Sequence, residues 1–327
     1  MKILVTGGAG YVGSHTVEEL VKEGFGVVVF DDLSMGHKEA VNPKAELVVG
    51  DLRNPKDVAG VFNKYKFDAV FHFAARSLVG ESMQDPMLYL GDNVASAINI
   101  FREMVEKKVN RFILSSTANL FNEPERIPIS EGEIINPGSP YGESKNLIER
   151  MLFWLDKTSN IHYAALRYFN AAGASPSGEI GEDHRPETHL IPIVLAVATG
   201  KRPKLTVNGN DYPTNDGTCI RDYIHVTDLA RAHILALGAI EKESKVYNLG
   251  SGKGYSILEI IKTTESVTGK KISYEFGPRR QGDPAKLVAS SDKIEKELGW
   301  KPKFGLKGII ETAYAWYKSH PEGFIEP

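Results

Sequence analysis

The chain has 327 residues, and 39 Lys and Arg stand against 42 Asp and Glu, for a formal net charge of −3. That balance argues against a nucleic-acid-binding protein, which usually carries a basic face. No apolar run reaches the roughly 18 residues of a membrane span, and Gly7 and Gly8 interrupt the N-terminal run too early for a signal peptide. Cys219 is the only cysteine, so neither an intrachain disulfide nor a thiolate metal cluster can form. We expect a cytoplasmic protein.

The first half of the chain alternates short apolar runs with segments of helical spacing. Strands alternating with helices predict a doubly wound parallel sheet of the Rossmann type, α/β in class. In chain order, the predicted elements are a strand at 2–6, a helix at 11–22, strands at 26–30 and 46–49, a helix at 56–64, a strand at 69–73, a helix at 86–106, a strand at 111–114, a helix at 141–155 and a strand at 162–166.

The pattern changes after Asn170. Residues 171–185 are rich in Gly, Pro, Ser and Asp and are predicted to form a loop. Shorter elements follow: a helix at 190–199, strands at 205–207 and 223–226, and a helix at 227–237. We predict a Rossmann domain of residues 1–170 with a return segment at about 221–250, and a smaller mixed α/β domain of residues 171–220 and 251–327.

A glycine-rich loop, 7–13, follows the first strand and opens the first helix. Glycines there allow a tight turn and a close approach to a pyrophosphate, which the helix N-terminus then binds. The acidic pair Asp31-Asp32 ends the second strand, where a carboxylate can bind the adenine ribose and repel a 2′-phosphate. This favours NAD over NADP. The glycine run 250–254 has the wrong spacing and is predicted to be only a turn.

Tyr141 and Lys145 lie four residues apart, on one face of a predicted helix. To act as a base at neutral pH, the phenol must lower its pKa by about 3, which is about 4 kcal/mol. One cation rarely supplies that, so we expect both the Lys145 ammonium and an oxidised nicotinamide to contribute. Tyr314 and Lys318 repeat the spacing, but follow no cofactor strand and are interpreted as packing plus surface charge.

A hydroxyl that binds the substrate oxygen should complete such a set, and the run 115–117 offers two serines and a threonine where a strand ends.

The pattern T-G-G-x-G-x-x-G resembles the short-chain dehydrogenase/reductase superfamily. Beyond it, the chain is similar from end to end to the UDP-glucose 4-epimerase family of the extended type. The matching stretches are 5–8, 50–54, 72–74, 79–82, 139–142, 167–170, 209–213, 221–226, 247–250 and 279–283.

The resemblance implies an isomerase that uses NAD and forms a homodimer. The catalytic set would be Thr117, Tyr141 and Lys145: the phenolate takes the C4 hydroxyl proton while C4 delivers hydride to NAD⁺, and the 4-keto sugar turns over before reduction. The implied cofactor contacts are Gly7, Gly10, Tyr11, Val12, Gly13, Asp31, Asp32, Asp51, Leu52, Phe73, Ala74, Ala75, Asn93, Ser115, Tyr141, Lys145 and Tyr168. The implied substrate contacts are Thr117, Asn170, His189, Leu190, Thr206, Val207, Asn208, Arg221, Tyr223, Arg280, Asp283 and Leu287.

The sequence departs from the family pattern at Ser77, His189 and Asn208. Leu287 stands where the family is thought to gate N-acetylated sugars, and its intermediate size weakly favours plain UDP-glucose and UDP-galactose. UDP-glucuronate or UDP-N-acetylglucosamine 4-epimerisation stays open, as does a non-enzymatic NAD-sensing protein, although both Tyr141 and Lys145 are present.

Sugar-nucleotide 4,6-dehydratases and UDP-glucuronate decarboxylases share this scaffold. Dehydratases carry an acid directly after the catalytic hydroxyl, whereas Ala118 and Asn119 follow here. Metal chemistry is not predicted. His184, Glu187 and His189 come nearest to a ligand set, but they lie beside Pro186 without a helix or strand signal, and are interpreted as solvated loop residues.

Overall fold

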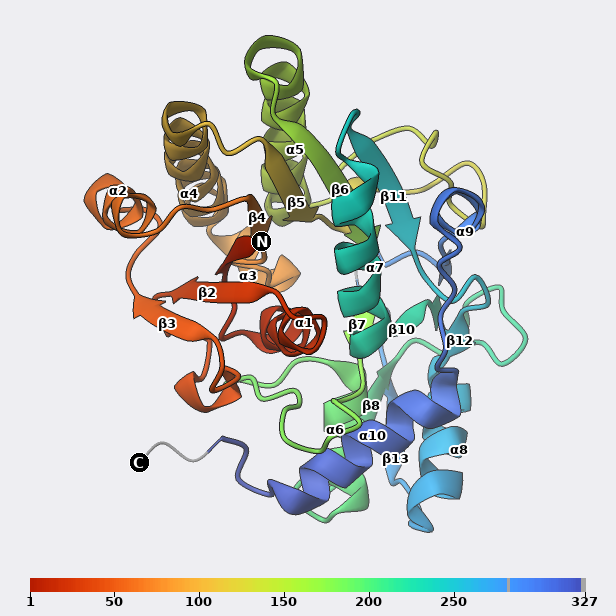
Figure 1. The fold of residues 1–327 in the computed structure, drawn as a ribbon. Coiled ribbons are helices and arrows are strands. Elements are labelled where there is room, and N and C mark those ends of the chain that lie inside the picture. The colour runs from red at the N-terminus through yellow and green to blue at the C-terminus, as the bar shows by residue number, and fades with distance from the viewer. Residues whose placement is uncertain (281–282, 325–327) are drawn as a thin grey trace.

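The computed structural model describes residues 1–280 and 283–324, and Gln281 and Gly282 of the family-like stretch 279–283 lie outside that part. Its centre is a seven-stranded sheet in the order β3-β2-β1-β4-β5-β6-β11, parallel throughout (Figure 1). The strands are β1 (Lys2–Thr6), β2 (Gly26–Asp31), β3 (Glu46–Val49), β4 (Ala69–His72), β5 (Arg111–Ser115), β6 (His162–Tyr168) and β11 (Lys245–Leu249). The predicted Rossmann-type sheet is thereby confirmed.

Helices cover both faces of the sheet (Figure 1). One layer contains α1 (Tyr11–Lys22) and α7 (Val226–Ala239), and the other contains α2 (Pro55–Lys64), α4 (Pro86–Lys107) and α5 (Pro140–Ser159). Along β1, Ile3 and Val5 belong to the first of these cores, and Leu4 between them belongs to the second. Because successive side chains point to opposite faces and both are buried, the strands are apolar without interruption.

Three helices of one layer, α2, α4 and α5, begin at side-chain caps. Ser139 accepts a hydrogen bond from the Gly142 backbone N–H (3.1 Å), and Pro140 takes the first position of α5. Asn54 and Asp85 cap α2 and α4 in the same way. Side-chain caps satisfy N–H groups that lack a partner in the first turn. They therefore set where α5 starts, and with it the position of Tyr141 in the first turn.

Small sheets and further helices are built around the carboxyl end of the large sheet. β7 (Asn170–Ala172) pairs with β10 (Tyr223–His225), β9 (Ile220–Arg221) pairs with β12 (Tyr255–Ser256) and β14 (Lys286–Leu287), and β8 (Leu205–Asn208) pairs with β13 (Tyr274–Gly277). The remaining elements are α3 (Val79–Gln84), α6 (Leu190–Ala198), α8 (Ile257–Thr268), α9 (Asp292–Leu298), α10 (Leu306–Ser319) and 3-10 turns at Lys38–Ala40 and Ala118–Leu120.

Most predicted elements lie within a few residues of the observed ones. The predicted loop 171–185 is partly wrong, because its first residues form the end of β7. Residues 250–254 form a turn, as predicted, and Tyr314 and Lys318 lie on α10 with the ammonium over the ring, 5.4 Å from its centroid. Within the described residues, no helix is both long and apolar enough to cross a membrane.

Candidate active site

The glycine-rich loop lies where the sheet order reverses, between β1 and its neighbour β4. Gly7 has a φ of 71°, and a Cβ added there would lie 2.4 Å from the Ala74 backbone nitrogen. A Cβ on Gly13 would lie 2.0 Å from the Gly7 carbonyl oxygen. A side chain is therefore excluded at both positions. Ligands of doubly wound sheets bind at such a reversal, beyond the carboxyl ends of the strands.

The residues around this loop fit a dinucleotide. Gly10 begins α1 without any side-chain cap, so the first N–H groups of the helix, at Tyr11 and Val12, are available to a pyrophosphate. Asp31 is buried and accepts hydrogen bonds from the N–H groups of Ala9 (3.0 Å) and Leu33 (2.9 Å), one on each oxygen. Each oxygen keeps a lone pair for a ribose hydroxyl.

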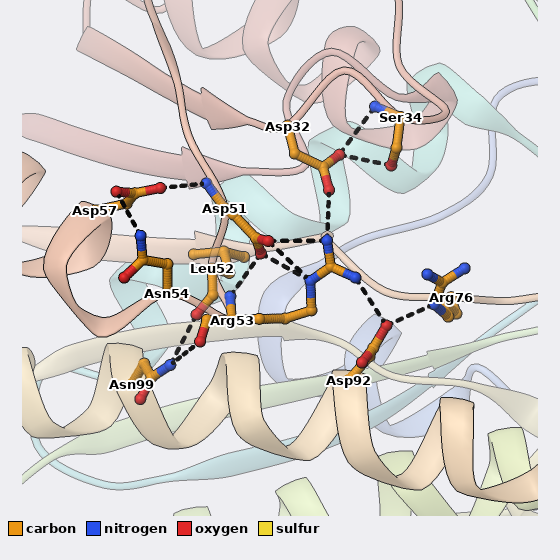
Figure 2. A network of polar contacts seen from close by, with 10 residues as sticks. All are labelled: Asp32, Ser34, Asp51, Leu52, Arg53, Asn54, Asp57, Arg76, Asp92 and Asn99. Carbon is orange, nitrogen blue, oxygen red and sulfur yellow. Dashed lines mark hydrogen bonds and ion pairs between the residues drawn. The ribbon is translucent and has the colours of Figure 1, made fainter.

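A cation surrounded by carboxylates lies beside these residues (Figure 2). Arg53 donates hydrogen bonds to Asp51 (2.8 Å) and Asp92 (3.1 Å), and its guanidinium lies 3.8 Å from Asp32. The hydrogen bonds that Arg53 donates to Asp51 are the largest cause of a raised pKa at Arg53. Three acidic neighbours therefore offset the charge of Arg53, which could otherwise attract a 2′-phosphate.

The segment after β4 is held by a buried asparagine. Asn93 on α4 accepts a hydrogen bond from the Arg76 N–H (2.8 Å) and donates to the Ser144 hydroxyl on α5 (2.9 Å). The side chain predicted to contact the cofactor is thus engaged in joining two elements of the site. Phe73, directly after β4, packs against the His233 ring, 4.9 Å between centroids, and the backbone of Ala74 lies against Gly7.

Tyr141 and Lys145 lie one turn apart on α5, next to the end of β5. The Lys145 ammonium is only 1% exposed and donates a hydrogen bond to the Ser115 carbonyl oxygen (2.9 Å). Burial lowers the pKa of Lys145 to about 8, although Glu149 opposes this. Burial raises the pKa of Tyr141, and the interaction with the Thr117 hydroxyl opposes the rise. The predicted trio is therefore brought together, with the phenol protonated at neutral pH in the chain alone.

Ser115 and Tyr168 join the ends of β5 and β6. Their hydroxyl oxygens lie 2.7 Å apart, and Tyr168 is close enough to Tyr141 for the two phenols to influence each other. Burial is the largest cause of a raised pKa at Tyr168. Tyr168 is thus a neutral phenol. Of these two phenols, Tyr141 is the one whose hydroxyl interacts with Thr117.

Five of the predicted substrate contacts lie on or beside the strands β7, β9, β10 and β14. Arg221 on β9 forms an ion pair and hydrogen bond with Asp283, and Leu287 on β14 pairs with Arg221 across the strands. Tyr223 is buried two residues further on, at 6% exposure. The Asn170 side chain donates to the Asp222 carbonyl oxygen (2.8 Å), so in this state it ties β7 to β10.

Leu287 also packs against the cluster of Leu120, Phe121 and Ile129, which follows Thr117 in the chain. Further predicted substrate contacts lie at the start of α6 and on β8. Leu190 lies between the core of β10 and the core of β8. On β8 itself, the side chain of Thr206 is exposed, that of Val207 is in the core and that of Asn208 is half-buried, while Arg280 is exposed.

His189, predicted as a substrate contact, lies beside two carboxylates. Its Nδ1 atom lies 2.9 Å from Glu182 and 3.2 Å from Glu187, and His184 faces the same carboxylates. The interpretation of solvated loop residues is wrong for His184 and Glu187, whose side chains are 22% and 24% exposed. His189 begins α6, so a helix start fixes the geometry that the sequence left open.

The family model described as GDP-mannose 4,6 dehydratase matches residues 4–313. A UDP-glucose 4-epimerase of Lactobacillus helveticus is 50% identical over 327 residues, which is 99% of each chain. The chain belongs to the UDP-glucose 4-epimerase family. A solved UDP-glucose 4-epimerase structure superposes with a TM-score of 0.98 at 50% identity over 100% of both chains. A Bifidobacterium longum enzyme of this name, in complex with NAD⁺ and UDP, gives 0.94 at 37% identity over 99% of this chain and 100% of that one.

In this UDP-glucose 4-epimerase family member, the sequence prediction missed a buried ion pair next to the candidate residues Tyr141 and Lys145. Glu149, one turn after Lys145, pairs with Arg167 at the end of β6 (2.5 and 3.0 Å) and accepts a hydrogen bond from Ser116 (2.5 Å). The sequence offered one signal for this ion pair, namely that Glu149 follows Lys145 by four residues and so lies on the same face of the helix. Asn119 donates to the Thr117 oxygen from both its backbone N–H (3.1 Å) and its side chain (3.3 Å).

Proposed function

We propose that this member of the family interconverts UDP-galactose and UDP-glucose by NAD-dependent oxidation and reduction at C4. The observation that carries the proposal is the convergence of Tyr141, Thr117 and Lys145 on the sheet edge that also carries the glycine-rich loop. A base, a hydroxyl donor and a cation beside a dinucleotide site supply the groups that oxidation of a sugar alcohol needs.

NAD fits the residues present. The uncapped N-terminus of α1 and the glycine loop would bind the pyrophosphate, and the Asp31 oxygens would accept from the adenine ribose. When bound, NAD⁺ supplies the hydride acceptor and a positive charge. Asp32 and Asp51 pair with Arg53 and offset its charge, so Arg53 does not serve as a cation for a 2′-phosphate.

The chain itself handles the proton. Tyr141 takes the proton of the C4 hydroxyl while Thr117 holds the substrate oxygen, and Asn119 keeps the Thr117 hydroxyl oriented. Lys145 lowers the pKa of the phenol by its charge and is fixed by the Ser115 carbonyl. Tyr141 then returns the proton when the 4-keto sugar is reduced on its other face.

The small sheets supply the anchor for UDP. Arg221 is partly buried, and the ion pair with Asp283 fixes the orientation of its guanidinium. We expect the guanidinium to bind the diphosphate. Leu287, packed behind the 118–120 turn, restricts the sugar end to groups without an N-acetyl arm. The sugar itself must turn over, so few tight contacts to it are expected.

A dehydratase is the competing reaction on this scaffold, but the geometry gives no acid for it. Ala118 follows the catalytic threonine, and Asn119 is bonded to that threonine. Glu149, the buried carboxylate nearest in sequence to Tyr141, already accepts hydrogen bonds from Arg167 and Ser116. Loss of the C6 hydroxyl would need a free acid.

The test is incubation of the purified chain with UDP-galactose, with and without added NAD, and identification of the products by NMR. We expect UDP-glucose. Tyr141→Phe should lower the rate by about 10²–10⁴-fold, the usual contribution of a general base. Tyr314→Phe, the tyrosine of the repeated spacing on α10, is the matched control and should keep the wild-type rate. A 4-keto-6-deoxy product would reject the proposal in favour of dehydration.

We also propose a cytoplasmic homodimer, in keeping with the family. Leu147 and Trp154 lie seven residues apart on α5, on one face, and are 38% and 57% exposed. Val105 on the neighbouring α4 is 46% exposed. A second copy covering these apolar side chains would explain their exposure in one chain. Sedimentation velocity should give twice the mass of one chain, and a monomer at micromolar concentration would reject the dimer.

A further inference from the structure

Four potential metal ligands converge in the segment before α6. These residues, Glu182, His184, Glu187 and His189, are called here the 182–189 cluster. One ligand atom from each lies within 4.8 Å of all the others. Two imidazole nitrogens and two carboxylate oxygens form a ligand set that suits zinc better than magnesium or calcium, which prefer oxygen alone.

The distances within the cluster match an ion-sized cage. The Nδ1 atom of His189 lies 2.9 Å from Glu182 and 3.2 Å from Glu187, and that of His184 lies 3.4 Å from Glu182 and 3.6 Å from Glu187. In a tetrahedral zinc site with bonds of about 2.0–2.1 Å, ligand atoms lie about 3.3 Å apart. The four nitrogen–oxygen distances bracket that value, with both oxygens of Glu187 involved, and one ligand atom from each residue lies within 4.8 Å of all the others.

Two buried polar atoms of this cluster lack a hydrogen bond among the described residues. Glu182 Oε1 and His184 Nδ1 are buried, and neither has a hydrogen-bond partner among the described residues. The Glu182 side chain is only 6% exposed. Buried polar atoms without partners are costly, and a bound ion is one of the recognised explanations. Both histidines turn the same atom, Nδ1, toward the two carboxylates.

The surroundings hold the ligands in place and give access to them. The His189 backbone N–H donates to Glu187 Oε1 (2.6 Å), which orients that carboxylate, and the His184 ring packs edge-on against Tyr11 (6.0 Å between centroids). A cavity of about 500 Å³, lined by Glu182, His184 and Glu187 and by Trp316 and His320 of the C-terminal segment, opens beside the cluster.

We propose that the 182–189 cluster is a structural zinc site with Glu182, His184, Glu187 and His189 as its four ligands. Such a closed site leaves no open position for substrate. Its effect would be mechanical, because the ion would join the start of α6 to the segment against which Tyr11 packs. Tyr11 in turn donates a hydrogen bond to the Gly173 carbonyl oxygen (2.6 Å). The zinc would thus connect the substrate-side helix to the glycine-loop helix, and His189 would be a ligand rather than a sugar contact.

The test starts from the full chain stripped with a chelator, dialysed, and then exposed to Zn²⁺. Elemental analysis after gel filtration should give one zinc per chain, and calorimetry should show one site. Co²⁺ should give the intense visible absorption of a tetrahedral ion, and Mg²⁺ should not bind. Less than about a tenth of an equivalent of zinc, or an octahedral cobalt spectrum, would overturn the proposal.

Variants separate this site from surface histidines. His184→Ala and Glu187→Gln should each weaken zinc binding at least about tenfold, since each removes one of four ligands. His162→Ala is the matched control, because His162 also pairs with a carboxylate, Asp156 (2.8 Å), and has no further ligands beside it. Circular dichroism shows whether each variant folds. Wild-type affinity in a folded Glu187→Gln variant, or equal loss in the control, would contradict the assignment.

Discussion

At the level of single residues, cofactor choice depends on the charges around the adenine ribose. Asp31 presents its carboxylate at the glycine loop, and Asp32 and Asp51 offset the charge of Arg53 (Figure 2). A 2′-phosphate would be placed among these carboxylates. At an effective dielectric constant of about 20, two unit charges about 4 Å apart interact by about 4 kcal/mol. Repulsion is therefore large enough to decide between NAD and NADP.

Asp31→Asn should narrow the preference for NAD over NADP by about tenfold or more, since about 1.4 kcal/mol corresponds to tenfold in affinity. The ratio of dissociation constants for NADH and NADPH, measured by fluorescence on nucleotide-free protein, checks this. Asp68→Asn is the matched control, because Asp68 lies at the amino end of β4, whereas the glycine loop lies at the carboxyl ends of the strands. An unchanged ratio in Asp31→Asn would show that the acidic residues do not select the cofactor.

The chemistry-bearing residues could be predicted because their spacing is local. Tyr141 and Lys145 share one helix, and the glycine loop is continuous in sequence. The bond from Lys145 to the Ser115 carbonyl could not be predicted, because it depends on how β5 ends against α5. All substrate contacts from the resemblance remain predictions, and the structure shows that two of these residues, Arg221 and Asp283, form an ion pair with each other.

At the level of secondary-structure elements, a buried ion pair joins α5 to β6 behind the catalytic trio. The side chains of Glu149 and Arg167 are 7% and 5% exposed. The Ser116 hydroxyl bonds to the same carboxylate, so the segment that leads to Thr117 is tied to the helix that carries Tyr141. Removing one partner leaves a buried charge without compensation, which costs far more than losing a surface pair.

Glu149→Gln should lower the free energy of unfolding by about 3 kcal/mol, at the low end for one partner of a buried pair. Glu106→Gln, from an exposed pair with Lys107, should change it by less than about 0.5 kcal/mol. Urea titrations of both variants give the two values. Equal, small losses would mean that the Glu149–Arg167 pair contributes no more than a surface contact.

The elements of the large sheet were predictable because each buried strand is a short apolar run ended by turn residues. β11 was missed, since only part of Lys245–Leu249 is buried. The start of α8 carried a usable signal: Ser256 and Glu259 form a capping box. β13 carried none, because Tyr274, Glu275 and Phe276 are exposed and show no alternation of burial.

At the level of the whole molecule, four buried histidines make stability depend on pH. Burial lowers the pKa of His15 and His233 to about 4, and that of His72 and His225 to about 3. In an unfolded chain histidine titrates near 6.5, so acid favours the unfolded state below that pH. In the metal-free chain, burial lowers the pKa of His184 and His189, but their interactions with Glu182 and Glu187 outweigh it and raise the pKa values to about 9 and about 10, so this contribution to stability is lost as pH rises through those values.

His233→Leu should reduce the loss of stability between pH 7.5 and pH 5.5. One histidine that is neutral when folded costs about 1.4 kcal/mol at pH 5.5, one pH unit below its unfolded pKa. The wild-type free energy of unfolding, from urea titrations, should therefore fall by about 1.4 kcal/mol more than that of the variant over this interval. Because only the difference between two pH values is compared, the variant's own stability does not enter. An equal fall in the free energy of unfolding for wild type and variant between pH 7.5 and pH 5.5 would contradict the role of His233 in acid destabilisation.

The arrangement of the whole chain was predictable only in outline. The sequence indicated a return of the chain to the sheet, and α7 and β11 do rejoin it, but the predicted domain boundaries remain a prediction. Three members of the 182–189 cluster stood out in the sequence but were interpreted as solvated loop residues, and Glu182 was missed. Their irregular spacing becomes meaningful only once the bend at Arg185-Pro186 and the start of α6 bring the ligands together.

The proposed reaction rests on the acidity of one phenol. In the chain alone, burial raises the pKa of Tyr141, and the Lys145 ammonium is bonded to the Ser115 carbonyl. Lysine alone therefore does not make Tyr141 a base, and the second charge must come from the oxidised nicotinamide.

The most direct test is an ultraviolet titration of the Tyr141 phenolate, taken as wild type minus Tyr141→Phe, with NAD⁺ bound and again with NADH bound. We predict that the phenolate forms at a clearly lower pH with NAD⁺ than with NADH. The same transition pH in both redox states would contradict the proposed origin of the catalytic base.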